Sequence, residues 1–171
     1  YRKNSAFITL SDEMKRTLVA RGVEPHKIAV IPNWADTETI QPIQRVENAL
    51  FDELNLPREG FYAVYAGTLG FSQEPDVILD AAKLLKNESD IRILVFGDGS
   101  LREHVENRVE REQIDNVLLF PLLSSAHTAR IYSLADVVLV PLKKGMTRIA
   151  VPSETQLALA AGRPVIVSAE A

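Results

Sequence analysis

The sequence predicts an α/β protein in which helices cover a parallel β-sheet. From Phe61 onward, apolar runs of five to seven residues alternate with segments of helical period. Gly, Pro, Asn, Asp or Ser stand at the joints, which is typical of repeated βα units. The runs are apolar on both faces, as a covered parallel sheet requires. The length of 171 residues suits one such domain, or one domain with a remnant of another.

Five strands joined by four helices are expected in this part of the chain. The strands are predicted at 61–67, 91–97, 116–121, 137–141 and 164–168. The helical patterns cover about 75–87, 100–113, 125–134 and 153–161. Pro75 stands in the first turn of the first helix, where proline is tolerated, and Gly162 follows the last helix as a left-handed cap.

Residues 1–40 are predicted to form a separate βαβ-like piece. It contains a strand at 6–10, a helix at 12–21 with Ser11 as its N-cap, and a strand at 27–31. Residues 41–60 are mostly polar, with a short helical pattern near 48–54, and are interpreted as an interdomain linker. Because Tyr1 is not an initiator methionine, we expect the chain to be a piece of a longer protein, truncated after its fifth strand.

Composition excludes several classes of function. The 19 Lys and Arg residues, against 23 Asp and Glu, form no basic block, which argues against a nucleic-acid partner. The absence of cysteine excludes disulfides, Cys-ligated metals and thiol catalysis, and fits a cytoplasmic protein. No apolar run approaches the ~20 residues of a spanning helix, so membrane contact is expected to be peripheral at most. The three histidines are far apart, and no metal site is predicted.

Two glycine-containing loops follow predicted strands, at the sheet edge where parallel α/β proteins bind ligands. Gly67-Thr68-Leu69-Gly70 can bring backbone amides close to phosphate oxygens, although a tight turn without a ligand explains it equally well. In Gly97-Asp98-Gly99-Ser100, Asp98 suits a ribose hydroxyl or a helix cap. The spacing is not GxGxxG, so no nicotinamide-binding fingerprint is indicated.

Two further loops at the same edge carry charge or a helix start. Lys143, Lys144 and Arg148 follow the strand at 137–141 and suit a diphosphate, with a solvated surface loop as the alternative. In the segment 151–156, Ser153 is predicted to cap a helix with Gln156 completing a capping box. The amides of such a helix start can hold a phosphate, although capping alone explains the residue types. The convergence of four loops on one edge favours a ligand site.

The order of these motifs resembles that of the family-4 retaining glycosyltransferases of GT-B fold, in particular the group for colanic acid, capsule and O-antigen biosynthesis. The motifs are ITLS at 8–11, KIAVIPNWAD at 27–36, YAGTLG at 65–70, FGDG at 96–99, YSLADV at 132–137, VPS at 151–153 and AAGRPVI at 160–166. Each motif is weak alone, but together, at this spacing, they are specific. The resemblance covers nearly the whole chain.

The resemblance implies that 61–171 is the Rossmann-like, C-terminal donor-binding domain of such an enzyme, and that 1–40 is a remnant of the N-terminal domain with the hinge. The domain would bind a nucleoside-diphosphate sugar without a metal or other cofactor, while the N-terminal domain supplies a sugar or lipid-linked sugar acceptor. The donor-binding residues it implies, together with those that the loops suggest, are Gly67, Thr68, Leu69, Gly70, Gly97, Asp98, Gly99, Leu122, Lys143, Lys144, Arg148, Pro152, Ser153 and Glu154. The catalytic residues remain unassigned.

The chain departs from the family pattern at charged positions. Thr68, Gln73 and Glu74 stand where many members have Arg, Lys and Gly in the first loop. In the last loop, Glu154 stands at a Lys position and Leu157 at a Glu position. The cations of the 143–148 loop are a hypothetical replacement for the missing first-loop cations.

Two alternatives to a sugar transferase remain open. A degenerate donor domain would serve as a non-catalytic interaction or sensing module. A GT-B epimerase that binds UDP-N-acetylglucosamine is a weaker alternative, because its histidine and acidic site residues are not evident. As a fragment, the chain is expected to bind nucleotide without turnover and to self-associate as a homodimer through unpaired strand edges.

Overall fold

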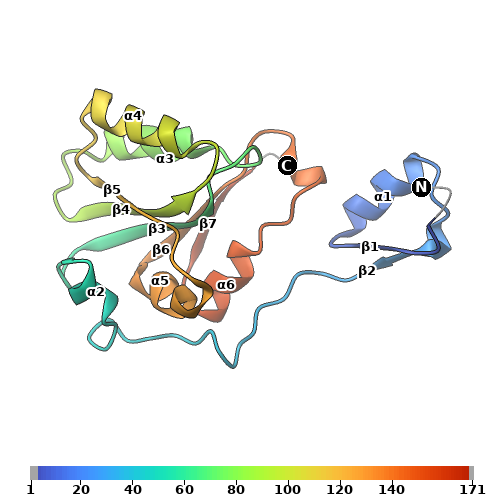
Figure 1. The fold of residues 1–171 in the computed structure, drawn as a ribbon, viewed down its shortest axis with the longest axis horizontal. Helices are drawn as coiled ribbons and strands as arrows, with labels where there is room; N and C mark the ends of the chain where they lie inside the picture. Colours follow the sequence, from blue (N-terminus) through green and yellow to red (C-terminus); the bar gives the residue numbers. More distant parts are fainter. Residues whose placement is uncertain (1–3, 170–171) are drawn as a thin grey trace.

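The computed structural model describes residues 4–169, which form a layered α/β body and a small βαβ unit beside it (Figure 1). The body is built on a five-stranded parallel sheet of order β5-β4-β3-β6-β7. Its strands are β3 (Phe61–Thr68), β4 (Ile91–Asp98), β5 (Val117–Phe120), β6 (Val137–Pro141) and β7 (Val165–Ser168). The predicted fold class and all five predicted strands are confirmed.

Helices cover both faces of this sheet. On one face lie α3 (Pro75–Leu84) and α4 (Arg102–Glu112), and on the other lie α2 (Leu50–Glu53), α5 (Thr128–Leu134) and α6 (Glu154–Ala160). Side chains of β3 alternate between the two cores: Tyr62 and Val64 pack with α2 and α5, whereas Ala63 and Tyr65 pack with α3. The helix expected over 75–87 ends at Leu84, and the one expected over 125–134 begins as a 3-10 turn at 125–127.

The central strand β3 pairs very differently with its two neighbours. It pairs with β4 along its whole length, from Phe61 opposite Ile91 to Thr68 opposite Asp98. With β6 it pairs only at 63–64, opposite 137–138. The helices that follow β3 and β4 lie on one face of the sheet, and those that follow β5 and β6 lie on the other. The neighbouring strands β3 and β6 therefore flank the switch point of the sheet, where the direction of winding reverses.

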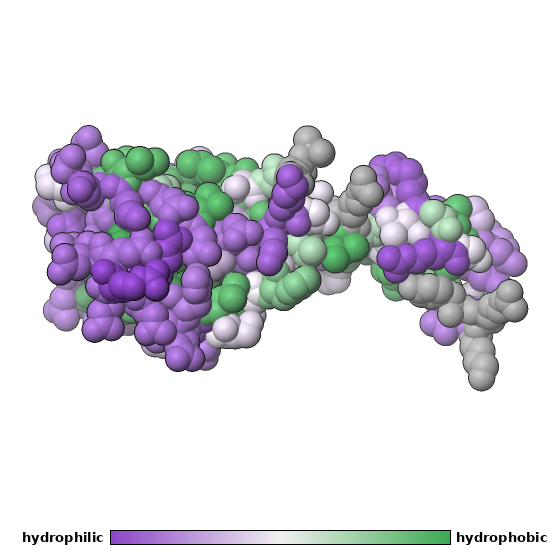
Figure 2. Space-filling model, turned by 90° about the horizontal axis from the view of Figure 1, so that it is seen from above, coloured by the Kyte–Doolittle hydropathy of each residue, from purple (hydrophilic) through white to green (hydrophobic). Residues whose placement is uncertain are grey.

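One margin of the body carries exposed apolar surface. Beside α3, an apolar hollow of about 340 Å³ is lined by Val77 and Ile78 of the helix, together with Leu139 of β6 and Ile166 of β7. Figure 2, seen from above, shows exposed hydrophobic surface on the body next to the hydrophilic surface of the charged helix α4. Strand β7, predicted to be buried, lies at the sheet edge with Ile166 and Val167 exposed. No helix within residues 4–169 is long and apolar enough to cross a bilayer.

The small unit has the predicted βαβ order. β1 (Phe7–Thr9) pairs in parallel with β2 (Ile28–Val30), and α1 (Asp12–Ala20) connects them through a 3-10 turn at Pro25–Lys27. Ser11 caps α1 as expected, because its hydroxyl accepts a hydrogen bond from the amide of Met14 at 3.2 Å.

The segment 41–60, expected to be a polar linker, is packed onto the body. Leu50 and Phe51 of α2 and the following Leu56 are buried in the core beside β3. This part of the expected interdomain linker therefore contributes to the core of the body. The short helical pattern near 48–54 corresponds to α2, but a pattern of so few residues does not show whether the helix packs onto a core.

A charged clamp fastens this segment to the amino ends of β3 and β6. Both oxygens of Asp136 lie 2.6 Å from Nη2 of Arg45, and Oδ2 also accepts the amide hydrogen of Tyr62 at 2.8 Å. Nη1 of Arg45 donates to the carbonyls of Arg58 and Gly60 at 3.0 and 2.9 Å. The two charged side chains are 27% and 29% exposed, so water screens their pairing only in part.

We expect Arg45→Ala to lower the free energy of unfolding by about 2 kcal/mol or more, because it leaves the half-buried carboxylate of Asp136 without its cation. Arg130→Ala is the matched control, since its ion pair with Glu53 is more exposed and longer, at 3.3 Å. That change should cost about 0.5 kcal/mol or less. Chemical denaturation measures both, and equal costs for the two variants would contradict the role of the clamp.

The helices α3 and α4 are joined by a network of ion pairs that predicts a pH dependence. Hydrogen bonds from Arg108, Lys83 and Arg111 lower the pKa of Glu112 from its ordinary value of 4.5 to about 2. A carboxylate with a lowered pKa in the folded state stabilises the protein above about pH 4.5, and this contribution is lost as the pH falls toward 2. Stability measured by denaturation should therefore fall over this window, and Glu112→Gln should make the fall shallower. An unchanged slope would contradict the assignment.

Candidate ligand-binding site at the switch point of the sheet

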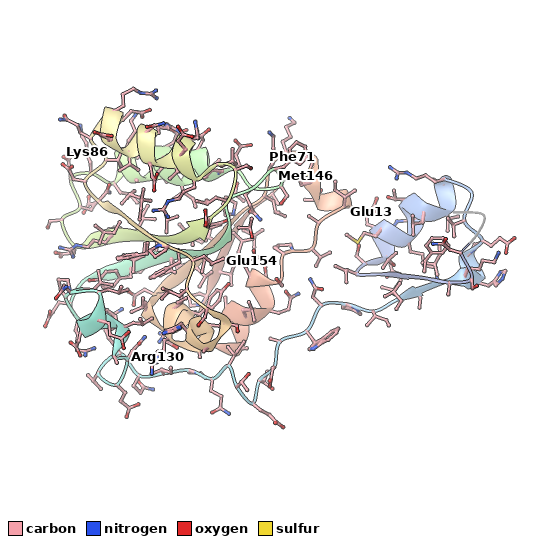
Figure 3. All side chains as sticks on the ribbon, in the orientation of Figure 1. Glu13, Phe71, Lys86, Arg130, Met146 and Glu154 are labelled. Carbon is pink, nitrogen blue, oxygen red and sulfur yellow. The ribbon has the colours of Figure 1, made fainter. Side chains whose placement is uncertain are left out.

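A pocket of about 530 Å³ lies beyond the carboxyl ends of β3 and β6. The loops that follow these strands lead to helices on opposite faces of the sheet, so they diverge and leave a crevice between them. The first loop supplies Thr68, Gly70, Phe71, Ser72 and Gln73, and the second supplies Leu142 and the residues from Ile149 to Glu154. Leu10 of the small unit completes the lining. Figure 3 shows Phe71 and Met146 on the two loops and Glu154 at the start of α6.

The first loop is anchored to the neighbouring βα loop through Leu69. This side chain is fully buried, its amide donates to the carbonyl of Asp98 at 2.8 Å, and its carbonyl accepts from the amide of Leu101 at 3.0 Å. A Cβ on Gly97 would lie 2.9 Å from the carbonyl oxygen of Gly67, and one on Gly99 would lie 2.5 Å from that of Leu69. Both glycines are therefore required by a close backbone approach.

The same loop is also anchored to β6. The amide of Lys143 donates to the carbonyl of Ser72 at 2.9 Å, and the amide of Glu74 donates to that of Pro141 at 2.9 Å. Gln73 lies opposite Leu142 in an antiparallel bridge. With anchors on both sides, the stretch from Thr68 to Gln73 forms a fixed wall of the pocket.

Several residues predicted from the 67–70 and 97–99 loops have packing roles. Leu69 is buried, and its amide is already donated to Asp98, so neither group is available to a phosphate. The carboxylate of Asp98 accepts the amide hydrogen of Gly99 at 2.7 Å, as in a capped turn. Gly97, Asp98 and Gly99 are not among the lining residues of the pocket, whereas Thr68 and Gly70 are.

The carboxylate of Glu154 lies over the end of β3. Its Oε1 is 2.8 Å from the position that a Cβ of Gly67 would take, so the glycine makes room for it. The hydroxyl of Tyr65 donates to the carbonyl of Thr68 at 2.9 Å, and that of Tyr132 donates to Ala66 at 3.3 Å. Burial and then the charge of Glu154 raise the pKa of both tyrosines, so both hydroxyls remain protonated donors at neutral pH.

The predicted capping box at the start of α6 is wrong. The hydroxyl of Ser153 makes no cap hydrogen bond, and its backbone is already helical, with φ −67° and ψ −21°. Ser11, which does cap a helix, has the extended backbone that capping requires, with φ −152° and ψ 160°. Pro152, Ser153 and Glu154 all line the pocket, and their role in donor binding stays a prediction.

The predicted cationic loop lies at the outside of the site. Lys143 and Lys144 are exposed and do not line the pocket, although Nζ of Lys143 is 5.4 Å from the ring centroid of Phe71. The side chain of Arg148 lies outside what the structure describes. Leu122 follows β5, is 48% exposed and is not part of the pocket wall. In the described part of the chain, no cluster of three His, Asp or Glu residues is placed to hold a metal ion.

Sequence reasoning did not name eight lining residues as parts of the site: Leu10, Phe71, Ser72, Gln73, Leu142, Ile149, Ala150 and Val151. Phe71 is 73% exposed at the pocket, Gln73 is 9% exposed, and Leu10 comes from the small unit. These three residues lie at the ends of predicted strands or directly after them, and this position is the sequence signal that could have placed them at the site. The result is a parallel α/β domain with a ligand pocket at its switch point, a class in which nucleotides and related ligands bind at this edge of the sheet.

The chain belongs to the family described as Glycosyl transferases group 1, whose model matches residues 46–171. It is 27% identical over 164 residues to WcaI of Escherichia coli K12, which is named for colanic acid biosynthesis, and this match covers 95% of the chain. It is 28% identical over 172 residues to WbjE of Pseudomonas aeruginosa, a probable glycosyltransferase, with 99% of the chain covered. The chain spans 40% and 42% of the lengths of these two relatives.

Solved structures share the fold. The Anabaena protein HepE, in its complex with UDP-glucose, superposes with a TM-score of 0.75 at 15% identity, over 95% of this chain and 44% of HepE. The C-terminal domain of LpcC, a group 1 glycosyl transferase from Francisella tularensis, gives a TM-score of 0.61 at 19% identity, over 78% of this chain and 69% of that domain. The likeness confirms the predicted Rossmann-like architecture of a GT-B half.

We expect Gly99→Ala to destabilise the protein by about 3 kcal/mol or more, because the new Cβ would collide with the carbonyl of Leu69 at a φ of +137°. Gly145→Ala is the control: its φ is +80°, but nothing lies within 4 Å of its added Cβ. It should cost only the backbone strain, about 1–2 kcal/mol. Urea denaturation of both variants measures the loss in the free energy of unfolding. Equal losses would show that the backbone at Gly99 does not closely approach the carbonyl of Leu69.

Proposed function

We propose that the chain is the nucleotide-sugar donor-binding part of a retaining glycosyltransferase that acts in surface polysaccharide biosynthesis. The observation that carries the proposal is the pocket at the switch point of the sheet in a chain of the group 1 family. The Anabaena neighbour was crystallised with UDP-glucose and with UDP and glucose, and the Escherichia coli relative is named for colanic acid biosynthesis, which supports the donor class and the role.

In this proposal the donor lies across the carboxyl ends of β3 and β6. The fixed loop from Thr68 to Gln73 supplies one wall, and the start of α6 supplies the other. The diphosphate group would face Lys143 and Lys144, whose charge would stabilise the leaving nucleoside diphosphate without a metal. A sugar or lipid-linked sugar acceptor would be held by the other domain of the full-length enzyme, on the cytoplasmic side of the membrane.

Isothermal titration of the chain with UDP, GDP, UDP-glucose and GDP-mannose tests this function. We expect at least one nucleoside diphosphate and its sugar to bind with a Kd below about 1 mM, and the others to bind more weakly. Absence of binding by all four ligands at millimolar concentration would overturn the proposal.

We predict that Lys144→Ala weakens binding of the preferred nucleoside diphosphate roughly ten- to hundredfold at low salt, because a charge-assisted hydrogen bond contributes about 1.5–3 kcal/mol. Lys86→Ala is the control, since Lys86 is exposed near the far end of α3, away from Phe71 and Glu154 (Figure 3). The affinity of Lys86→Ala for the nucleoside diphosphate should equal that of the unmodified chain. An affinity that Lys144→Ala leaves unchanged would remove the 143–148 loop from the phosphate site.

We also expect these 171 residues alone to bind the donor without transferring its sugar. Positioning of donor against acceptor contributes roughly 7–11 kcal/mol to lowering such a barrier, and the chain spans only about two fifths of the curated relatives that it matches. A coupled assay for release of nucleoside diphosphate in the presence of sugar acceptors measures this. Release above the rate of donor hydrolysis alone would contradict it.

A further inference from the structure

We propose that Asn33 is a positioning residue for the pocket, because it holds one of the pocket walls in place from the small unit. This wall, here called the second wall, consists of residues 149–154, which lead into α6. Asn33 acts through the carbonyl of Val151 and does not itself line the pocket. The proposal deepens the donor-binding function and rests on it, since it concerns what fixes the surface that the ligand meets.

The two walls of the pocket are fixed in different ways. Backbone hydrogen bonds join the first wall, residues 68–73, to its neighbours on both sides. In the second wall, as far as the structure describes the chain, the other hydrogen bonds are local. The amides of Ile149 and Ala150 donate to the carbonyl of Met146 at 2.9 and 2.8 Å, and the remaining bonds are those that begin α6. Local bonds fix the shape of the segment, but not its distance from the first wall.

The residue types of the second wall also limit how it can be fixed. Pro152 has no amide hydrogen, so it donates no backbone hydrogen bond to the rest of the body. The hydroxyl of Ser153 makes no cap hydrogen bond at the start of α6, in contrast to that of Ser11 at the start of α1. A donor from another part of the chain is therefore needed to hold this segment by a hydrogen bond.

That donor stands on a well-fixed part of the small unit. The amide of Ile31 donates to the carbonyl of Thr9 at 2.8 Å and so continues the pairing of β1 with β2. Pro32 then restricts its own backbone and that of Ile31. Nδ2 of Asn33 donates to the carbonyl of Val151, 118 residues away in the sequence, at 2.8 Å in a partly buried position. Water competes only in part for such a bond.

The other contacts of the small unit with this region are less directional. Figure 1 shows the small unit on the side of the body where the segment before α6 runs, and α1 lies beside the 3-10 turn at Met146–Arg148. Leu10 lines the pocket, and Ile149 borders both the pocket and a hollow of about 250 Å³ in the small unit. Apolar contacts tolerate sliding, whereas a hydrogen bond requires a defined distance and angle. We therefore assign the placement of the second wall to Asn33.

Backbone order without any ligand is the first test. Nitrogen relaxation is measured on the unmodified chain, on Asn33→Ala and on Asn33→Asp, whose carboxylate has a similar shape but cannot donate. We expect order parameters near about 0.85 at Val151 and Ser153 in the unmodified chain, and a fall of at least about 0.1 in both variants. Leu69 of the first wall should keep its value. Equal falls in the two variants would exclude the new charge as the cause.

Affinity for UDP, measured by isothermal titration, is the second test. Both Asn33 variants should bind UDP about three- to tenfold more weakly, because a wall that is no longer held must be ordered on binding. Asn116→Ala is the matched control: Nδ2 of Asn116 donates to the carbonyl of Ala82 at 2.9 Å within the body, and Asn116 does not line the pocket. It should lower the stability of the fold but leave UDP affinity and the order of the second wall unchanged.

The outcomes separate this proposal from the donor-binding function. Unchanged order parameters at Val151 and Ser153 in the Asn33 variants would overturn it, and so would a loosened wall with unchanged affinity for UDP. If the unmodified chain binds neither UDP nor UDP-glucose, nor the guanosine ligands, the donor-binding function fails instead. The order parameters alone then decide whether Asn33 holds the second wall.

Discussion

The short pairing between β3 and β6 is the constraint on which the site depends. The two strands are in register only at their amino ends, where Asp136 binds both Arg45 and the amide of Tyr62. Beyond Val64 no further pairs join them, and their connections leave toward opposite faces of the sheet. A structure that is fastened at one end and open at the other produces a crevice at the open end. The clamp lies at the amino ends of the two strands, and the pocket lies at their carboxyl ends.

The walls of this crevice are held rigidly by backbone contacts that leave little freedom. Leu69 joins the first loop to the β4–α4 connection, and the bridge between Gln73 and Leu142 joins it to β6. The glycines at 97 and 99 follow from the first of these contacts, whereas at 67 the atom that a Cβ would meet is Oε1 of Glu154, the end of a flexible side chain. A loop anchored on both sides presents its groups at a lower entropic cost of ordering on binding. The glycines of these motifs therefore act mainly by permitting close packing.

The sequence predicts the sheet well because its signal is local. Apolar runs such as 61–67 and 137–141 are buried on both faces, and this pattern can be recognised in each run without knowledge of its neighbours in space. The buried Leu50 and Phe51 were interpreted as part of a linker because their burial depends on packing against residues distant in sequence, such as Tyr62 and Leu134. Ser11 and Ser153 show the same limit at single residues: both precede helices, but only the backbone of Ser11 is extended enough to cap. Residue type suggests a cap, and backbone geometry decides it.

The site residues also differ in how far the sequence alone could predict them. Thr68, Gly70 and Pro152 were predictable because strand ends of a parallel sheet meet at one edge. Glu154 was also predicted as a site residue, but the position of its carboxylate over Gly67 depends on the side-chain conformation, which the sequence does not give. Leu10 and Asn33 depend on the placement of the small unit: Leu10 lines the pocket, and Nδ2 of Asn33 donates to the carbonyl of Val151 at 2.8 Å. Since Val151 leads directly into α6, this hydrogen bond joins the small unit to the segment that precedes Glu154, and the wall of the pocket includes residues of both units.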